Sequence, residues 1–283
     1  MEERTGAQEK SPSGQREQYT WGYGAAWQQY HTTTSAGAQR ASFLLPYLRP
    51  GMSLLDCGCG IGAITVELAR RLAPGEVVGI DIAPVQVERS QALAREKGVT
   101  NARFEVGNAY ELPFPDASFD AAFAHRVLEH LRDPLRALKE MRRVLKPGGV
   151  AGILDPDRGS TLFSPARPLL QELMSLVLRI REQQGSSLYY ARHQRGLLLE
   201  AGFAHSEGFA HADSYGNHEM TSMLGAIVTE VLRSPANVEL AVSQGWADRA
   251  KLEAMIAEVL AWAERPDAYW AILECAAVGW VGD

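Results

Sequence analysis

Three glycines spaced two residues apart are the first feature of the sequence that points to chemistry. Gly58, Gly60 and Gly62 directly follow a short run that is expected to be a strand, and they precede a helical stretch. Glycine lets a backbone approach a ligand closely, and free amide N–H groups converge where a helix begins. The spacing therefore predicts a cofactor-binding loop between a strand and a helix.

The glycine loop alone leaves two cofactors open. Gly58 to Ala63 also fit the dinucleotide pattern G-x-G-x-x-G/A, and Asp81 lies about 20 residues further on, where a carboxylate can hold a ribose. Asp56 precedes the first glycine by two residues. A carboxylate there can hold the ammonium group of a methionine moiety, whereas it would repel a pyrophosphate. Charge complementarity favours S-adenosylmethionine (SAM) over NAD.

Two downstream segments also favour SAM. Asn108 and Ala109 close the third expected strand, where an amide side chain and the adjacent backbone can read an adenine edge. The segment Lys146-Pro147-Gly148-Gly149 precedes the fifth expected strand, and NAD-dependent dehydrogenases have no fixed requirement for such a segment. Both segments agree with the interpretation of Asp56.

Short apolar runs that alternate with helical stretches must position these residues. We expect strands at 53–57, 76–82, 102–107, 119–125 and 150–155, and helices near 62–73, 84–97 and 133–146. This alternation is typical of parallel βαβ units. It predicts an α/β fold with a doubly wound sheet.

The rest of the chain is mostly helical by its pattern. We expect helices at 165–182, near 190–201, at 217–233 and at 247–263, with strands at 203–212 and 270–280. The predicted organisation is a disordered tail (1–18), an N-terminal helical cap (19–50), a SAM-binding core (51–158), a helical lid (159–200) and the remaining strands (201–283) with a helical insertion at about 214–266.

Residues 51–155 resemble the class I SAM-dependent methyltransferases, and most closely those of ubiquinone and menaquinone biosynthesis. The resemblance implies a Rossmann-like sheet of seven strands with the last one antiparallel, SAM across the strand ends, and inserted helices as a substrate lid. It also implies roles for individual residues. Asp56, Gly58 and Gly60 would line the methionine part, Asp81 would bind the ribose hydroxyls, Ile82 would lie against adenine, and Asn108 with Ala109 would meet the adenine edge. The family more often has Asp at position 108, so Asn108 keeps an acceptor and adds NH2 donors.

The candidate catalytic residues are His125, Tyr23 and His193. His125 ends the fourth expected strand, which in the family faces the cofactor and the substrate, so we expect it to contact SAM or substrate or to act as a base. Tyr19 and Tyr23 belong to an aromatic segment that either packs on the core or closes over the ligand, and Tyr19 is assigned to the cofactor. His193 lies where the substrate chamber is expected.

Composition narrows the partners. A net charge of -6 and a pI near 5.7 disfavour a general grip on nucleic acid. No apolar run is long enough to span a membrane, and the N-terminus lacks a secretory signal, so we expect a cytoplasmic protein. The pair Cys57 and Cys59 has no further ligand nearby, so no metal site is expected. The oligomeric state is left open, with a homo-oligomer as one alternative.

The predicted function is methyl transfer from SAM to a small aromatic or apolar acceptor, such as a quinone precursor or a secondary metabolite. In-line displacement would release S-adenosylhomocysteine (SAH), and the methylated atom, carbon, oxygen or nitrogen, is left open. Two alternatives remain at this point: an NAD(P)-dependent oxidoreductase, and a SAM-binding protein without catalysis.

Overall fold

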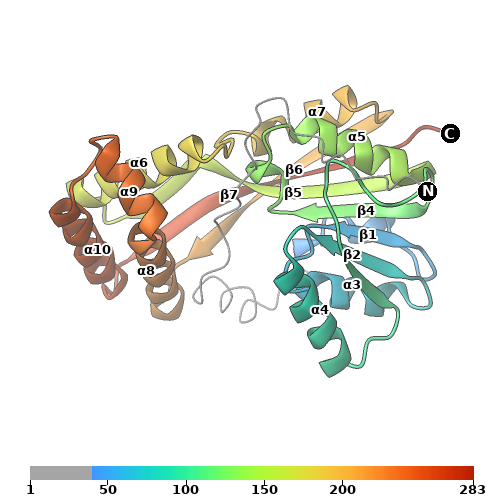
Figure 1. The fold of residues 1–283 in the computed structure, drawn as a ribbon, viewed down its shortest axis with the longest axis horizontal. Helices are drawn as coiled ribbons and strands as arrows, with labels where there is room; N and C mark the ends of the chain where they lie inside the picture. The colour runs from blue at the N-terminus through green and yellow to red at the C-terminus, as the bar shows by residue number, and fades with distance from the viewer. Residues whose placement is uncertain (1–39) are drawn as a thin grey trace, which may run out of the picture.

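One mixed sheet of seven strands runs through the computed structural model, which describes residues 40–283 (Figure 1). Its strands are β1 (Leu54–Cys57), β2 (Val77–Asp81), β3 (Ala102–Val106), β4 (Phe119–His125), β5 (Leu145–Ser164), β6 (His205–Tyr215) and β7 (Tyr269–Trp280). The strand order is β3-β2-β1-β4-β5-β7-β6, and β7 runs antiparallel to both of its neighbours. The predicted α/β sheet with an antiparallel last strand is confirmed.

Helices cover both faces of the parallel half of the sheet. The covering helices are α3 (Ala63–Leu72), α4 (Pro84–Glu96) and α5 (Pro134–Val144), whereas α7 (Gln194–Glu200) packs against α5 and the strands β6 and β7. Leu54 and Phe123 pack with Leu68 of α3, whereas Leu55 and Ala124 pack with helix α5. Side chains alternate between faces along a strand, so these two sets define an α3 face and an α5 face of the sheet. The face to which each side chain belongs decides which site residues can meet.

Strand β5 is much longer than predicted. The prediction of 150–155 is wrong in its length, because β5 continues to Ser164 with an irregularity after Asp157. Pro156 cannot donate a backbone hydrogen bond to a neighbouring strand, but β4 ends at His125, opposite Leu154. Beyond that point β5 is no longer flanked by β4, and a strand edge tolerates proline.

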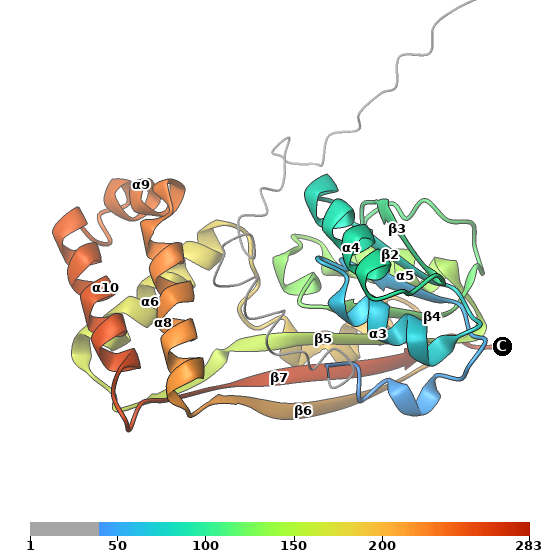
Figure 2. The same ribbon diagram turned by 90° about the horizontal axis from the view of Figure 1, so that it is seen from below.

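The extended parts of β5, β6 and β7 connect the core to a separate group of helices, here called the helical cluster (Figure 2). The cluster consists of α6 (Pro168–Gln183), α8 (His218–Arg233), α9 (Pro235–Ser243) and α10 (Arg249–Ala263). It has its own apolar core around the fully buried Trp262, which packs edge-on against Trp270 of β7. Helix α9 was not predicted from the sequence. Within residues 40–283 no helix is long and apolar enough to cross a membrane.

Replacing Asp248 with alanine is expected to lower the free energy of unfolding by about 1 kcal/mol. Asp248 caps the N-terminus of α10, where its side chain accepts a hydrogen bond from the amide of Lys251 at 2.7 Å. Urea unfolding of the two proteins measures the difference. An unchanged midpoint would show that this cap contributes nothing to the stability of the helical cluster.

Candidate functional site

The glycine loop is held against the end of β2 by backbone hydrogen bonds. The amides of Gly58 and Cys59 both donate to the carbonyl of Ile80, each at 2.8 Å. The Asp81 carboxylate then accepts from the amides of Gly60 at 3.0 Å and Ala83 at 2.9 Å. Burial raises the pKa of Asp81, although these amide bonds oppose the shift. Asp81 therefore joins the loop to the start of α4.

Two loop glycines differ in what surrounds them. Gly58 has φ +78, and a Cβ there would lie 2.2 Å from Cγ2 of Val127, so this glycine is required by packing. Gly60 has φ +53, and a Cβ there would meet nothing within 4 Å. Gly60 is therefore the point of the loop that leaves space for a ligand.

Asp56 lies on the α3 face beneath the loop, and it is only 2% exposed. Its carboxyl accepts a hydrogen bond from Oγ1 of Thr65 on α3 at 2.6 Å. Burial raises the pKa of Asp56 to about 7, with the Thr65 bond lowering it and the nearby Asp81 raising it further. Burial also raises the pKa of Cys57 to about 12, so this thiol stays protonated at neutral pH.

Exposed apolar side chains flank the Asp81 carboxylate. Ile82 follows β2 and is 60% exposed, and Val106 at the end of β3 is 53% exposed. Asn108 is exposed, with its Oδ1 accepting from the amide of Tyr110 at 3.0 Å, while Ala109 packs against the core. A carboxylate beside exposed aliphatic groups suits a ribose that carries a flat base. Because Oδ1 is engaged, Asn108 would read adenine with its NH2 group.

His125 ends β4 on the α3 face, level with the start of the glycine loop. The register pairs Ala124 with Cys57, so His125 lies one position further out, beside Gly58, and its partner on the other side is Leu154. Its ring stacks on Phe123 at a centroid distance of 6.4 Å. The carboxyl ends of β1 and β4 flank the point where the strand order reverses, the usual ligand site of open α/β sheets.

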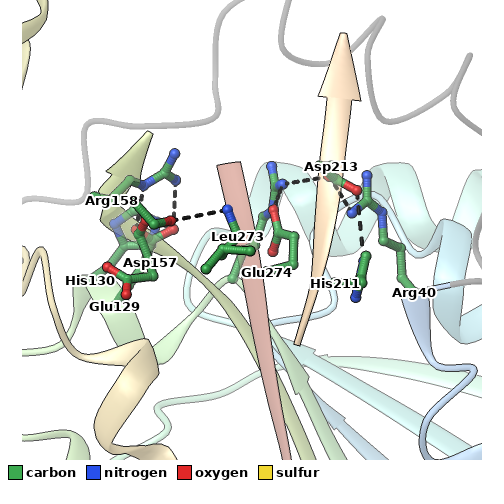
Figure 3. A network of polar contacts seen from close by, with 11 residues as sticks. Arg40, Glu129, His130, Asp157, Arg158, His211, Asp213, Leu273 and Glu274 are labelled. Carbon is green, nitrogen blue, oxygen red and sulfur yellow. Dashed lines mark hydrogen bonds and ion pairs between the residues drawn. The ribbon is translucent and has the colours of Figure 1, made fainter. Parts of the chain in front are cut away.

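A charged cluster lies on the α3 face next to His125 in the register, and Figure 3 labels its members Arg40, His211, Asp213 and Glu274. Arg126 has φ +54 and is buried, and it forms ion pairs with Glu274 of β7 and Asp213 of β6. Asp213 also pairs with Arg40 at 2.5 Å and lies 3.7 Å from Nε2 of His211. Left-handed backbone in a residue other than glycine is strained, and such strain gathers at functional sites.

A second polar network lies at the other side of Figure 3 and fixes the loop after β4. Arg158 of β5 donates two hydrogen bonds, of 2.9 and 2.8 Å, to Glu129 in the 3-10 helix η2 (Leu128–His130). Burial alone would raise the pKa of Glu129, but Arg158 and the neighbouring cations hold it well below its usual range. Burial lowers the pKa of His130 to about 4, so this imidazole is neutral at pH 7. These groups position the loop and do not suggest a proton shuttle.

Tyr19 and Tyr23, which were predicted to be site residues, fall outside the described residues. His193 is exposed in the 3-10 helix η3 (Ala191–His193), beside Arg192, whose guanidinium pairs with Asp157. Arg126 and its partners on β6 and β7 were not predicted from the sequence. The available signal was Glu274, the one charged residue in the apolar run 270–280.

Comparison with known proteins identifies the family. A family model described as a methyltransferase domain matches residues 48–195. The "Probable methyltransferase ltbC" of Aspergillus luteorubrus is 32% identical over 95% of this chain and 99% of its own length. An uncharacterized methyltransferase of Schizosaccharomyces pombe is 34% identical over 57% of this chain, and the match spans 60% of that protein. The 2-methyl-6-phytyl-1,4-hydroquinone methyltransferase of Synechocystis is 37% identical over 46% of this chain and 41% of its own length.

Solved structures share the fold. The [4+2]-cyclase SpnF aligns with a TM-score of 0.51 and 26% identity, covering 90% of this chain and 84% of its own. Phosphoethanolamine N-methyltransferase 2 of Haemonchus contortus, solved with SAM, aligns with a TM-score of 0.54 and 17% identity, covering 90% of this chain and 58% of its own. With the family match and the full-length relative, these findings decide between the two cofactors in favour of SAM. The chain belongs to the methyltransferase-domain family and is a class I SAM-dependent methyltransferase.

Proposed function

We propose that this protein transfers the methyl group of SAM to a small aromatic or apolar acceptor. The observation that carries the proposal is the group formed by Gly60, Asp81 and Ile82 at the strand ends. An open glycine, a half-buried carboxylate and an exposed aliphatic side chain lie together there. This set fits the methionine chain, the ribose diol and the adenine of one extended ligand.

Each group of SAM has a proposed partner among the described residues. Asp81 would accept from the ribose hydroxyls with the lone pairs that its two amide bonds leave available. Ile82 would lie against the adenine, and Asn108 would donate to its edge. Asp56 would hold the ammonium group from beneath the loop. Bound SAM supplies an activated methyl group on a sulfonium.

The protein's own contribution is placement of the acceptor. His125, at the end of β4, would contact the acceptor or the cofactor, and its imidazole is suited to take a proton from an acceptor hydroxyl. The helical cluster would act as a lid that excludes water, because β5, β6 and β7 carry it beyond the carboxyl ends of the parallel strands (Figure 2). His193, exposed on η3, stays a weaker candidate for the base.

Two observations favour an aromatic acceptor: the name of one relative, and the aromatic side chains on the α3 face of the sheet. The Synechocystis relative is named for a prenylated hydroquinone. In this chain Phe43 packs between Phe123 and Phe209 on the face that carries His125, with ring centroids 6.3 and 6.5 Å apart. An apolar aromatic surface beside a histidine suits a phenolic ring. Whether oxygen or carbon receives the methyl group is a question for the assay.

Transfer of radiolabelled methyl from SAM to a panel of phenols, hydroquinones and alkaloid amines tests the proposal. We expect SAH to bind and at least one neutral aromatic acceptor to become labelled. SpnF, a cyclase, shares this fold, so turnover must be measured separately from cofactor binding. Binding of SAH without labelling of any acceptor would favour a SAM-binding protein of another function.

The affinity for SAH is expected to increase as the pH rises from about 6 to about 8. Because burial raises the pKa of Asp56 to about 7, the carboxyl is largely neutral below that pH and cannot hold an ammonium group. The dissociation constant should fall by up to about tenfold per pH unit below pH 7 and level off above it. Calorimetric titration with SAH measures this profile.

Asp56→Asn is the control for the pH profile. The variant removes the titrating group and leaves Asp81, whose pKa is also raised by burial, in place. Its profile should lose the step near pH 7 that Asp56 produces. A wild-type affinity that does not change with pH would show that Asp56 does not hold the ammonium group.

A further inference from the structure

Glu274 of β7 is a fully buried carboxylate with one unused oxygen. The side chain is 0% exposed, and Oε1 forms an ion pair with Arg126. Oε2 has no hydrogen-bond partner among residues 40–283. Buried carboxylate oxygens are almost always satisfied, so an unpaired one marks a place where a further donor is expected. That donor is either a bound molecule or an ordered water.

The position of Glu274 connects it to the candidate active site. Val278 packs with Phe123 on the α3 face, and the register of β7 is regular from Val278 to Glu274, so Glu274 points to that same face. Its neighbour on β6 is His211, one pleat beyond the row that contains His125. Arg126 follows His125 directly in the chain, after β4, and pairs with Glu274 on β7, which lies on the other side of β5. Glu274 therefore lies on the sheet extension that leads from the methyl-transfer position to the helical cluster.

Within residues 40–283, the ion pairs around Glu274 join two cations, Arg126 and Arg40, to two carboxylates, Glu274 and Asp213. His211 lies beside Asp213. A cationic group brought to Oε2 would also meet Arg126, and an anionic group would meet the two carboxylates. A neutral O–H group is repelled neither by Arg126 nor by the carboxylates, because it donates one hydrogen bond and adds no charge.

We infer that Oε2 of Glu274 accepts a hydrogen bond from a hydroxyl group of the methyl acceptor, and that the acceptor is a neutral hydroxylated aromatic compound. This inference rests on the proposed function and adds the residue that selects among acceptors. Glu274 is then a specificity-determining residue. It favours hydroxyarenes over their ethers and over aromatic amines that carry a positive charge.

Calorimetry on the full chain saturated with SAH tests this inference. The probes are 2-methyl-1,4-hydroquinone, its dimethyl ether, and benzylamine as the cation. We expect the wild type to bind the hydroquinone at least tenfold more tightly than either of the others. In Glu274→Gln the amide oxygen can keep the contact with Arg126 and place NH2 where Oε2 was, so the preference for the hydroquinone should disappear or reverse in favour of the ether.

Glu207→Gln is the matched control, because Glu207 lies on the neighbouring strand β6 with an exposed side chain. This variant should keep the wild-type preference. The inference is overturned if the wild type shows no preference, if it binds none of the probes while it binds SAH, or if Glu274→Gln keeps the preference, which would assign Oε2 to a structural water. Failure of the wild type to bind SAH would instead overturn the proposed function. If Glu274→Gln does not fold, the ranking of the three probes by the wild type still tests the acceptor class, because a wild type without the preference overturns the inference.

Discussion

Replacing Asp81 with alanine is expected to weaken SAH binding by roughly 10- to 150-fold. Hydrogen bonds to a charged acceptor contribute about 1.5 to 3 kcal/mol, and each 1.4 kcal/mol changes an affinity tenfold. The variant loses the acceptor for the ribose diol and also the bonds from the Gly60 and Ala83 amides that hold the loop in place. Calorimetric titration with SAH measures the loss. Asp81→Asn keeps one acceptor oxygen and should fall between alanine and the wild type.

The matched control for this variant is Asp248→Ala. Asp248 also accepts a backbone hydrogen bond, but it does so in the helical cluster. Its loss should lower stability and leave SAH affinity unchanged. Equal SAH affinity of Asp81→Ala and the wild type would remove Asp81 from the cofactor site.

The strands of the parallel half of the sheet could be predicted because the local pattern of apolar residues determines where they form. Strands that are covered on both faces need continuous apolar runs, and β1 and β4 lie within one residue of their predicted ends. Once the strands are placed, the fold itself brings Asp81 and His125 to the same edge. Spacing and charge are therefore enough to predict the proposed cofactor half of the site.

The proposed substrate half could not be predicted, because pairing between residues far apart in the sequence builds it. The segment Asp155-Pro156-Asp157 has the composition of a turn. It can form a strand because β4 ends opposite Leu154, so that no strand on that side needs a hydrogen bond from Pro156. Glu274 stands alone in an apolar strand, and its partner Arg126 lies 148 residues earlier. The sequence shows that a carboxylate is unusual in this apolar strand, but it does not show which cation forms an ion pair with it.

Two glycine substitutions, Gly60→Ala and Gly98→Ala, should have the same effect on stability but different effects on SAH binding. Gly60 has φ +53 and Gly98 has φ +64, and a Cβ at either position would meet nothing within 4 Å. Alanine in the left-handed region costs roughly 1–2 kcal/mol, so both Gly60→Ala and Gly98→Ala should lose a similar free energy of unfolding. Urea unfolding measures this shared cost, which depends only on local backbone conformation.

Only Gly60→Ala is expected to lose SAH affinity. The added methyl group would enter the space that the loop leaves open beside the amide bonded to Asp81. Overpacking of one methyl group costs about 1–3 kcal/mol, which corresponds to roughly a 5- to 150-fold weaker affinity. Gly98 follows α4 outside the proposed site, so Gly98→Ala should bind SAH as the wild type does. If the two variants bind SAH equally well, the cofactor does not pass over Gly60, and the loop serves only to turn the chain from β1 into α3.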